Sequence, residues 1–340
     1  MKLLSIVIPT YNMEALLPRC LDSLVIPVAT DKLEVLIVND GSRDNSLAIA
    51  QKYEEKYPNI FRVIDKENGN YGSTINKGIE LATGKYFRIL DSDDFYNNDE
   101  LVSFVEKLEL CKADLVLTDY CVDRENHTSK MNISGIEKNV EHNLEEVDIS
   151  HIRNFAMHSL TVKSSILKDN KITLQTGISY TDTEFCYYPL LYSKTICYYN
   201  FLVYRYQIGR DGQTVNLDSQ IRCLSHMRKI IYRMFDNLDV AASDSVNRNR
   251  CYIASRIINL YYSTILCYDK SNKELSYLAD VDKKLYKYKY IDAYLRNNTM
   301  FGVPFYSRYH DFKLLSNSSI YLLYYRLIKY VSRLYRIMFP

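Results

Sequence analysis

The sequence predicts an α/β protein: a mostly parallel sheet with helices on both faces, followed by a helical C-terminal region. Three observations support this. Over the first hundred residues, short apolar runs alternate with segments of helical periodicity, an order typical of parallel sheets covered by helices. Each apolar run ends in a polar cluster. From about residue 219 onward the chain reads as helical and is rich in Tyr, Lys and Arg.

The predicted elements follow in regular order. Strands that read as continuous apolar runs are expected inside a parallel sheet. Residues 123–150 are polar and without pattern, so we expect an excursion or a flexible flap, and a mixed stretch then runs to Tyr206. We place a boundary near residue 215, between a first domain (1–215) and a helical region (216–340). The strands are predicted at 3–8, 33–38, 61–64, 86–90 and 114–118, with helices near 16–24, 47–50, 75–82 and 101–110.

Composition excludes several classes of protein. A chain of 340 residues with 47% hydrophobic residues can bury a core, so it is not a disordered protein. The net charge of +2 gives no reason to expect a nucleic-acid partner. Eight cysteines without CxxC pairs indicate a reducing compartment, and six histidines without HxxxH spacing argue against a zinc site. No segment is apolar for long enough to predict a signal peptide or a membrane span.

Polar clusters follow four of the predicted strands. In parallel sheets, ligands bind beyond the carboxyl ends of the strands, so these clusters are expected to meet at one edge. The dinucleotide fingerprint GxGxxG is missing after the first strand, and the phosphate-binding loop GxxxxGK[ST] is missing throughout. The clusters are Thr10-Tyr11-Asn12, Asp40-Gly41-Ser42, Asn68-Gly69 and Asp91-Ser92-Asp93.

The last of these clusters contains three carboxylates within four residues, Asp91, Asp93 and Asp94. Like charges crowd at a cost unless a cation or a proton relieves them. Mg²⁺ and Mn²⁺ prefer carboxylate oxygens and bridge to substrate phosphates. The sequence therefore suggests a divalent metal site, and the alternative is a solvated Asp-rich turn that caps the next helix.

Four motifs in this order closely resemble the family 2 glycosyltransferases, which have the Rossmann-like GT-A fold. The resemblance covers about residues 3–120 and continues in patches to about 215. It implies that 1–215 is a nucleotide-sugar-binding and catalytic domain that uses Mn²⁺ or Mg²⁺, with bacterial polysaccharide synthesis as its setting. The motifs are Ile8-Pro9-Thr10-Tyr11-Asn12, Val38-Asn39-Asp40-Gly41-Ser42, Asn76-Lys77-Gly78 with Ala82-Thr83-Gly84, and Asp91-Ser92-Asp93-Asp94.

The resemblance also assigns roles at the donor side. Asp40 would face the nucleotide base, where a carboxylate can accept from a pyrimidine imide N–H; its structural alternative is a helix-capping turn. Asp93 would ligate the metal, and Asp91 would bind the ribose or reach the metal through water. Asp94 would serve as a helix cap or a supporting group. The remaining nucleotide-sugar contacts would come from Pro9, Thr10, Tyr11, Glu14 and Asn68.

The segment 177–185 resembles the family's acceptor-side motif. That motif usually reads Glu-Asp, and here it reads Thr181-Asp182. The resemblance implies that Asp182 is the catalytic base, which removes the acceptor hydroxyl proton in a single displacement with inversion. Glu184 is a rival base, and a helix N-cap is the structural alternative for Asp182.

Two basic positions bear on the donor diphosphate. Arg210 lies in a segment that resembles the family's closing segment, whereas Arg205 has the alternative of a structural ion pair. Many family members carry an Arg where this chain has Ile75. Lys77 and Arg210 are the candidates to supply the missing contact.

Four basic residues near the end of the chain, Arg326, Lys329, Arg333 and Arg336, recur at helical spacing. This pattern is typical of a helix lying on an anionic bilayer. The alternative is a C-terminal helix packed on its own domain with a solvated basic face. The membrane interpretation predicts a cytoplasmic protein, peripheral on the inner face of the cell membrane.

Together these interpretations predict a metal-dependent inverting glycosyltransferase. It would move a sugar from a nucleotide-diphosphate donor, UDP-linked by preference, to a hydroxyl of a glycan or a lipid-linked acceptor. One alternative is a nucleotidyltransferase, whose Gly-rich phosphate loop is missing here. The other is a non-catalytic nucleotide- or glycan-binding subunit of a polysaccharide synthase complex, which the change at Thr181 keeps open.

Overall fold

The structure is a computed structural model that describes residues 2–26, 29–209, 213, 217–268, 274–297 and 306. Contacts between residues divide the chain into two compact units. The first comprises Met1–Asp211 with Ser243–Val246, and the second comprises Gly212–Ala242 with Asn247–Pro340. Each unit is described by itself.

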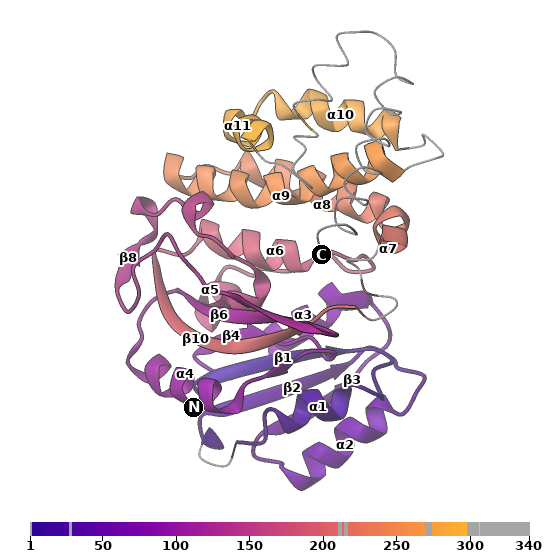
Figure 1. Cartoon of the computed structure of the whole chain (residues 1–340), viewed down its shortest axis with the longest axis vertical. Helices are drawn as coiled ribbons and strands as arrows, with labels where there is room; N and C mark the ends of the chain where they lie inside the picture. Colours follow the sequence, from indigo (N-terminus) through magenta and orange to yellow (C-terminus); the bar gives the residue numbers. More distant parts are fainter. Residues whose placement is uncertain are drawn as a thin grey trace. The chain divides into compact units, whose positions relative to one another are not determined.

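A mixed sheet forms the centre of the first unit (Figure 1). Within the described residues it has ten strands, in the order β3-β2-β1-β4-β9-β6-β10-β5, with β7 on β6 and β8 on β10. The first four strands of this order are parallel to one another, as predicted. Thr10 pairs with Asn39, and Asn39 pairs with Asp65, so the carboxyl ends lie along one edge. These strands are β1 (Leu4–Thr10), β2 (Leu33–Asn39), β3 (Phe61–Asp65) and β4 (Tyr86–Ile89).

The second half of the sheet reverses direction. The short strand β9 (Leu160–Lys163) lies antiparallel between β4 and β6 (Leu115–Arg124). β10 (Thr195–Gln207) then runs parallel to β6, and β5 (Phe95–Tyr96) lies antiparallel on β10. The sequence analysis assigned β9 only to a mixed stretch, because four residues are too few to show a period.

Residues 123–150, expected to be an excursion or a flexible flap, contain two strands of the sheet. β7 (His127–Met131) pairs with β6, and β8 (Glu141–Asn143) pairs with β10. Both strands lie at the margin of the sheet with mostly exposed side chains, so no apolar alternation marks them. Three short 3₁₀ helices follow, η2 (Leu144–Glu146), η3 (Ile149–His151) and η4 (Met157–Ser159).

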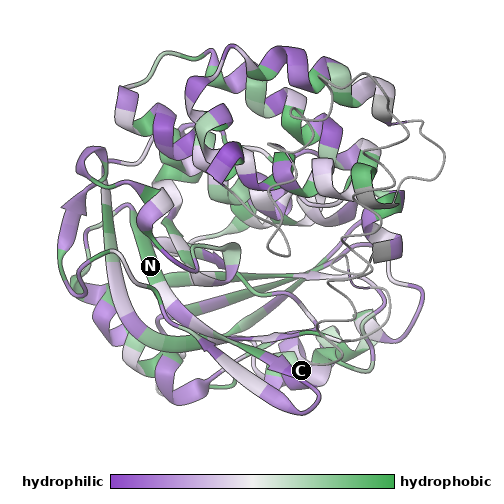
Figure 2. Cartoon of the chain, turned by 45° about the horizontal axis from the view of Figure 1, so that its top comes forward, coloured by the Kyte–Doolittle hydropathy of each residue, from purple (hydrophilic) through white to green (hydrophobic). Residues whose placement is uncertain are grey.

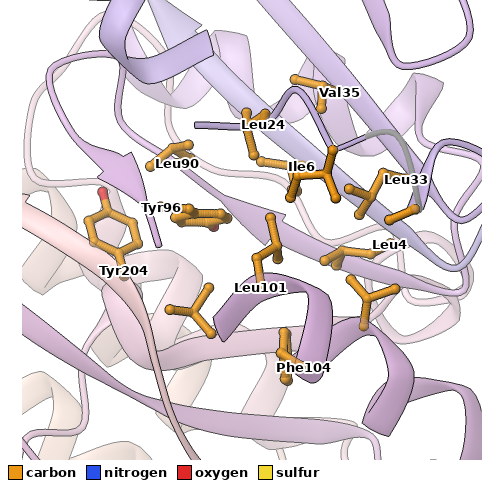
Figure 3. Packing of buried hydrophobic residues seen from close by; sticks show 14 of the residues in the cluster. Leu4, Ile6, Leu24, Leu33, Val35, Leu90, Tyr96, Leu101, Phe104 and Tyr204 are labelled. Atoms are coloured by element: carbon orange, nitrogen blue, oxygen red, sulfur yellow. The ribbon is translucent and has the colours of Figure 1, made fainter. Parts of the chain in front are cut away.

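Helices cover both faces of the sheet, because side chains alternate between the two faces of each strand. Leu4 and Ile6 point into a core with Leu21 and Leu101, drawn in Figure 3 with its neighbours. Val7 points the opposite way, against Gly78 of α3. One face is covered by α1 (Leu17–Asp22), α2 (Ser46–Lys56) and α4 (Asn98–Leu110), and the other by α3 (Asn70–Leu81), α5 (Ser164–Asp169), α6 (Asp182–Tyr187) and the turn η5 (Tyr188–Leu191).

The second unit is helical in the part that the structure describes, as predicted. α8 buries Met227, Ile230, Ile231 and Met234, a spacing that places them on one helix face. Hydrophobic and hydrophilic residues alternate along these helices in Figure 2. Among the described residues, no helix combines the length and the apolar character needed to cross a bilayer. The helices are α7 (Leu217–Arg222), α8 (Leu224–Leu238), α9 (Asp244–Tyr268), α10 (Leu275–Leu285) and α11 (Lys289–Asn297).

Candidate active site

Hydrogen bonds join the strand ends that the sequence places at one edge. The Asp40 amide donates to the carbonyl of Thr10 at 2.8 Å, and the Asn68 side chain donates to the carbonyl of Asp40 at 2.9 Å. The Ser92 hydroxyl donates to the carbonyl of Pro9 at 2.8 Å. The ends of β1, β2, β3 and β4 therefore converge, as the analysis of strand order predicts.

The loop after β1 leaves one aromatic ring exposed. Tyr11 is 42% exposed, whereas Thr10 is buried. Asn12 adopts a left-handed backbone with φ of 53°, which is uncommon outside glycine. Glu14 accepts two bonds from Asn45, at 2.9 Å from its amide and 2.8 Å from its side chain, so its carboxylate ties this loop to the loop after β2.

Asp40 is buried and held by a cation. Its Oδ1 accepts from Lys66 Nζ at 2.6 Å and from the amide of Gly69 at 2.9 Å. Gly69 is the N-cap residue of α3, so Asp40 also satisfies a backbone donor at the start of that helix. The sequence analysis did not single out Lys66, because a lysine beyond a strand gives no pattern of its own.

Asp91 and Asp93 are half-buried at the end of β4. Tyr71, from the first turn of α3, donates to Asp91 Oδ1 at 2.7 Å. Arg19 of α1 donates to the main-chain carbonyl of Asp93 at 2.9 Å, which fixes the backbone of this turn. The carboxylates predicted to hold a metal are thus supported from both faces of the sheet.

Asp94 is fully buried and reaches β10 instead of a helix. It accepts from the Tyr204 hydroxyl at 2.6 Å and from the Gln207 amide at 2.7 Å. Burial, together with the charges of Asp91 and Asp93, raises the pKa of Asp94 well above its usual range. Of the two roles expected for Asp94, the helix cap is wrong, because Asn97 caps α4 with a side chain that accepts from the Glu100 amide. The bonds of Asp94 to Tyr204 and Gln207 fit the other role, that of a supporting group.

A histidine joins these carboxylates. One ligand atom each from Asp91, Asp94 and His158 can be chosen so that all three lie within 4.8 Å of one another. Carboxylate oxygens suit Mg²⁺ and Mn²⁺, and imidazole suits first-row transition metals, so this donor set fits a divalent cation. The sequence analysis missed His158, because a single histidine in η4, far along the chain from Asp91, carries no spacing signal.

Asp182 lies near the same aromatic side chains as Asp91. It is the first residue of α6, after Thr181 at the N-cap position. Burial raises the pKa of Tyr71, and the negative charges of Asp91 and then Asp182 raise it further. The pKa of Tyr206 is raised in the same way, by burial and by the surrounding aspartates, Asp182 included. The donor-side carboxylates and the proposed base therefore both act electrostatically on Tyr71 and Tyr206.

Glu184, the rival base, is fully buried. Its carboxylate accepts from the Gln175 amide at 2.7 Å and from the Gln175 side chain at 3.0 Å. This geometry gives Glu184 a structural role in holding the segment before α6. Gln175 in turn lies against Gly72 of α3.

The basic candidates have different surroundings. Arg205 forms two bonds of 2.8 Å to Asp123, which is the structural alternative considered for it. Lys77 pairs with Glu80 at 2.9 Å on an outer face of α3, and Ile75 is buried in the core. Arg210 lies outside the described residues.

Residues 5–166 match the sequence model of glycosyl transferase family 2. A poly(ribitol-phosphate) beta-glucosyltransferase of Bacillus spizizenii is 31% identical over 222 residues, which cover 63% of this chain and 33% of that protein. The putative glycosyltransferase EpsH of Bacillus subtilis is 29% identical over 60% of each chain. The chain thus aligns with a third to three fifths of the length of these relatives.

Two solved structures share the fold. TarS residues 1–349 of S. aureus, in complex with UDP-GlcNAc, superposes with a TM-score of 0.65 and 21% identity, covering 86% of this chain and 84% of that one. The mannosyltransferase PcManGT of Pyrobaculum calidifontis, in complex with GDP-Man and Mn²⁺, has a TM-score of 0.52 and 15% identity, covering 86% and 84% of the two chains. Residues 5–166 therefore match glycosyl transferase family 2, and the chain shares the α/β fold of TarS, which is of the GT-A type.

Proposed function

We propose that this chain is an inverting glycosyltransferase that transfers a sugar from a UDP-sugar to a hydroxyl of a glycan or lipid-linked acceptor in surface polysaccharide synthesis. One observation carries the proposal. Tyr71 bonds to Asp91 at 2.7 Å, and the charge of Asp182 also raises the pKa of Tyr71, so the donor-side and acceptor-side carboxylates both act on one side chain. A transferase needs both groups close to one anomeric carbon.

The donor proposal assigns the nucleotide to the ends of β1, β2 and β3. The exposed ring of Tyr11 would stack on the base, and Asp40 would accept from its imide N–H, beside Pro9, Thr10 and Glu14. Asn68 and Asp91 would contact the sugar nucleotide, with Arg210 on the diphosphate. UDP is favoured because TarS, which shares the fold, is solved with UDP-GlcNAc and with UDP.

Asp91 and Asp93 would hold Mn²⁺ or Mg²⁺ at the diphosphate. A bound divalent cation neutralises charge on the leaving nucleotide. Asp182 would accept the proton of the acceptor hydroxyl, whose oxygen attacks the anomeric carbon from the side opposite the nucleotide. A single attack of this kind inverts the anomeric configuration.

The acceptor proposal draws on a basic surface pocket in the first unit. It has a volume of about 480 Å³ and lies between α3 and α5. Four lysines line it, Lys66, Lys77, Lys168 and Lys171, against one carboxylate, Glu80. Lys66 pairs with Asp40 and Lys77 with Glu80, so the excess of positive charge comes from Lys168 and Lys171. Positive charge suits a phosphate-bearing acceptor, such as the poly(ribitol-phosphate) named for the Bacillus spizizenii relative.

Two substitutions test the proposed function against a non-catalytic subunit. Asp182→Asn should keep UDP-sugar binding but cut transfer by about 100-fold or more, within the range for loss of a general base. Asp93→Ala should abolish the Mn²⁺-dependent part of UDP binding. Titration calorimetry and a radiolabelled transfer assay measure the two effects. Unchanged transfer in Asp182→Asn would move the base elsewhere, and binding without any transfer by the unmodified chain would favour the non-catalytic subunit.

A further inference from the structure

His158 is held in a cage of aromatic rings. Its imidazole stacks on Tyr120 with ring centroids 5.4 Å apart and lies 4.2 Å from the ring centroid of Tyr206. Tyr204 meets it edge-on at 4.7 Å. Rings over the faces of an imidazole leave its nitrogens directed along the ring edge, so the cage fixes the direction in which His158 can bind a partner.

The backbone of His158 is fixed by a buried cation. Arg88 of β4 donates to the His158 carbonyl at 2.6 Å, and also to Thr118 at 2.8 Å and Thr161 at 3.0 Å. Its guanidinium is fully buried. Burial of an arginine is costly, so these three bonds firmly determine where η4 lies on the sheet. Ring and backbone are therefore both held in place before any ligand arrives.

This fixed imidazole lies beside the two carboxylates that end β4. The ligand atoms of Asp91, Asp94 and His158 lie within 4.8 Å of one another. Two ligands of one cation lie up to about 4.2 Å apart, twice a bond of about 2.1 Å, so a small inward movement suffices to share a cation. Asp94 accepts from Tyr204 and Gln207, and Asp91 accepts from Tyr71 through Oδ1. Asp91 is the carboxylate of this group that the proposed function already gives to the cation, so it is the partner considered for His158.

We propose that a ring nitrogen of His158 ligates the divalent cation together with Asp91. The proposal rests on the proposed function, because it concerns the cation of the same donor site. A nitrogen ligand changes the preference of the site, since imidazole favours transition metals over Mg²⁺. The chain therefore prefers Mn²⁺ to Mg²⁺, and His158 is one origin of that preference.

A purely packing role for His158 gives a different expectation. A stacked ring without a ligand role can be replaced by phenylalanine, which keeps the contacts with Tyr120 and Tyr206 and removes only the nitrogens. His158→Phe therefore separates the two roles. His151→Phe is the matched control, because His151 is exposed in η3 of the same unit.

The test uses the full chain with UDP. Manganese affinity is measured from the electron paramagnetic resonance of free Mn²⁺, and magnesium affinity by competition. His158→Phe should weaken Mn²⁺ binding by about tenfold or more and Mg²⁺ binding by less than about threefold, with His151→Phe unchanged. Circular dichroism reports whether the variants are folded.

A second measurement needs no variant. Electron spin echo spectroscopy of Mn²⁺ bound to the unmodified chain should show a nitrogen coupling that changes when histidine alone is labelled with ¹⁵N. Bound Mn²⁺ without that coupling overturns the proposal, as does a folded His158→Phe chain with unchanged Mn²⁺ affinity, and both leave the UDP-sugar function standing. An unmodified chain that binds no UDP with either metal would overturn the proposed function itself, and the ligand role with it.

Discussion

At the scale of single residues, the phenol of Tyr71 bonds to Asp91 on the donor side and is subject to the charge of Asp182 on the acceptor side. Tyr71→Phe removes only the hydroxyl that donates to Asp91 at 2.7 Å. A bond to a charged group is worth about 1.5–3 kcal/mol, so kcat/KM for transfer should fall about tenfold or more. Steady-state kinetics with a UDP-sugar measure this.

The chain offers a matched control for that substitution. Tyr53 donates to Asp22 at 2.6 Å between α2 and α1, a tyrosine–aspartate pair of the same chemistry elsewhere in the unit. Tyr53→Phe should leave kcat/KM unchanged. Equal losses in the two variants would show that the Tyr71 hydroxyl has no special role in transfer.

Glu184 and Asp182 should respond oppositely to amide substitution. Glu184→Gln places an amide nitrogen opposite one of the two Gln175 donors, at a cost of about 1–3 kcal/mol for a buried mismatch. We expect a lower unfolding midpoint in urea, with transfer per folded molecule largely kept. Asp182→Asn should show the reverse, with normal stability and little transfer. If Glu184→Gln were stable but inactive and Asp182→Asn destabilised but active, Glu184 would be the base.

At the scale of elements, α3 packs against the segment that leads to Asp182. A Cβ on Gly72 would overlap the carbonyl oxygen of Gln175. Alanine is favoured over glycine in a helix by about 1 kcal/mol, but such an overlap costs about 1–3 kcal/mol. Gly72→Ala should therefore lower the melting temperature and reduce transfer, as thermal unfolding and a transfer assay can measure.

Ser103→Ala is the control for Gly72→Ala, because it also introduces an alanine into a helix, but at an exposed position. Ser103 lies on the exposed face of α4, so Ser103→Ala should leave stability and transfer almost unchanged. A Gly72→Ala chain more stable than the unmodified chain would mean that α3 and the Gln175 segment do not approach as closely as the structure has them.

The ion pair that links β6 to β10 predicts a dependence of stability on pH. Burial opposes ionisation of Asp123, but the bonds from Arg205 and Thr128 outweigh it and lower the pKa of Asp123. Because the folded pKa lies below the unfolded value of about 3.9, the stabilisation is complete above about pH 4 and is lost as pH falls through the folded pKa. Asp123→Asn should lose about 1–2 kcal/mol at neutral pH, with allowance for the partly exposed Arg205.

Urea unfolding at several pH values tests this prediction. The difference between the unmodified chain and Asp123→Asn should shrink between about pH 4 and pH 2. Asp169→Asn, at an exposed position in α5, is the control and should follow the unmodified chain throughout. A difference that stays constant through the acid range would exclude ionisation of Asp123 as its source.

At the scale of the whole molecule, the basic stripe near the C-terminus carries the membrane proposal. Arg326, Lys329, Arg333 and Arg336 lie outside the described residues, so this remains a prediction from sequence. Each basic group near an anionic surface contributes about 1 kcal/mol. The full chain should sediment with phosphatidylglycerol vesicles at low salt and not with phosphatidylcholine vesicles. A chain truncated after residue 315 that still sediments would remove the proposal.

The parallel half of the sheet was predictable because its information is local. The runs that form β1 and β2 are mostly apolar and are buried throughout, and polar residues follow each strand. The strands from β9 onward were harder, because β9 is four residues long and β7 and β8 are exposed. The same holds for the site. Asp91 and Asp93 could be predicted because they belong to a motif, whereas Lys66 and His158 belong to none.

The sequence by itself determined the α/β order, the convergence of polar strand ends and the resemblance to the family 2 glycosyltransferases, because these depend on periodicity and on residues close together along the chain. Only the tertiary structure decided which side chains meet across long separations. Asp94 faces Tyr204 of β10, Asp40 pairs with Lys66, and His158 adjoins Asp91. The physical reason is that such contacts depend on strand register and on how η4 packs over the sheet. Neither can be predicted from a local sequence pattern.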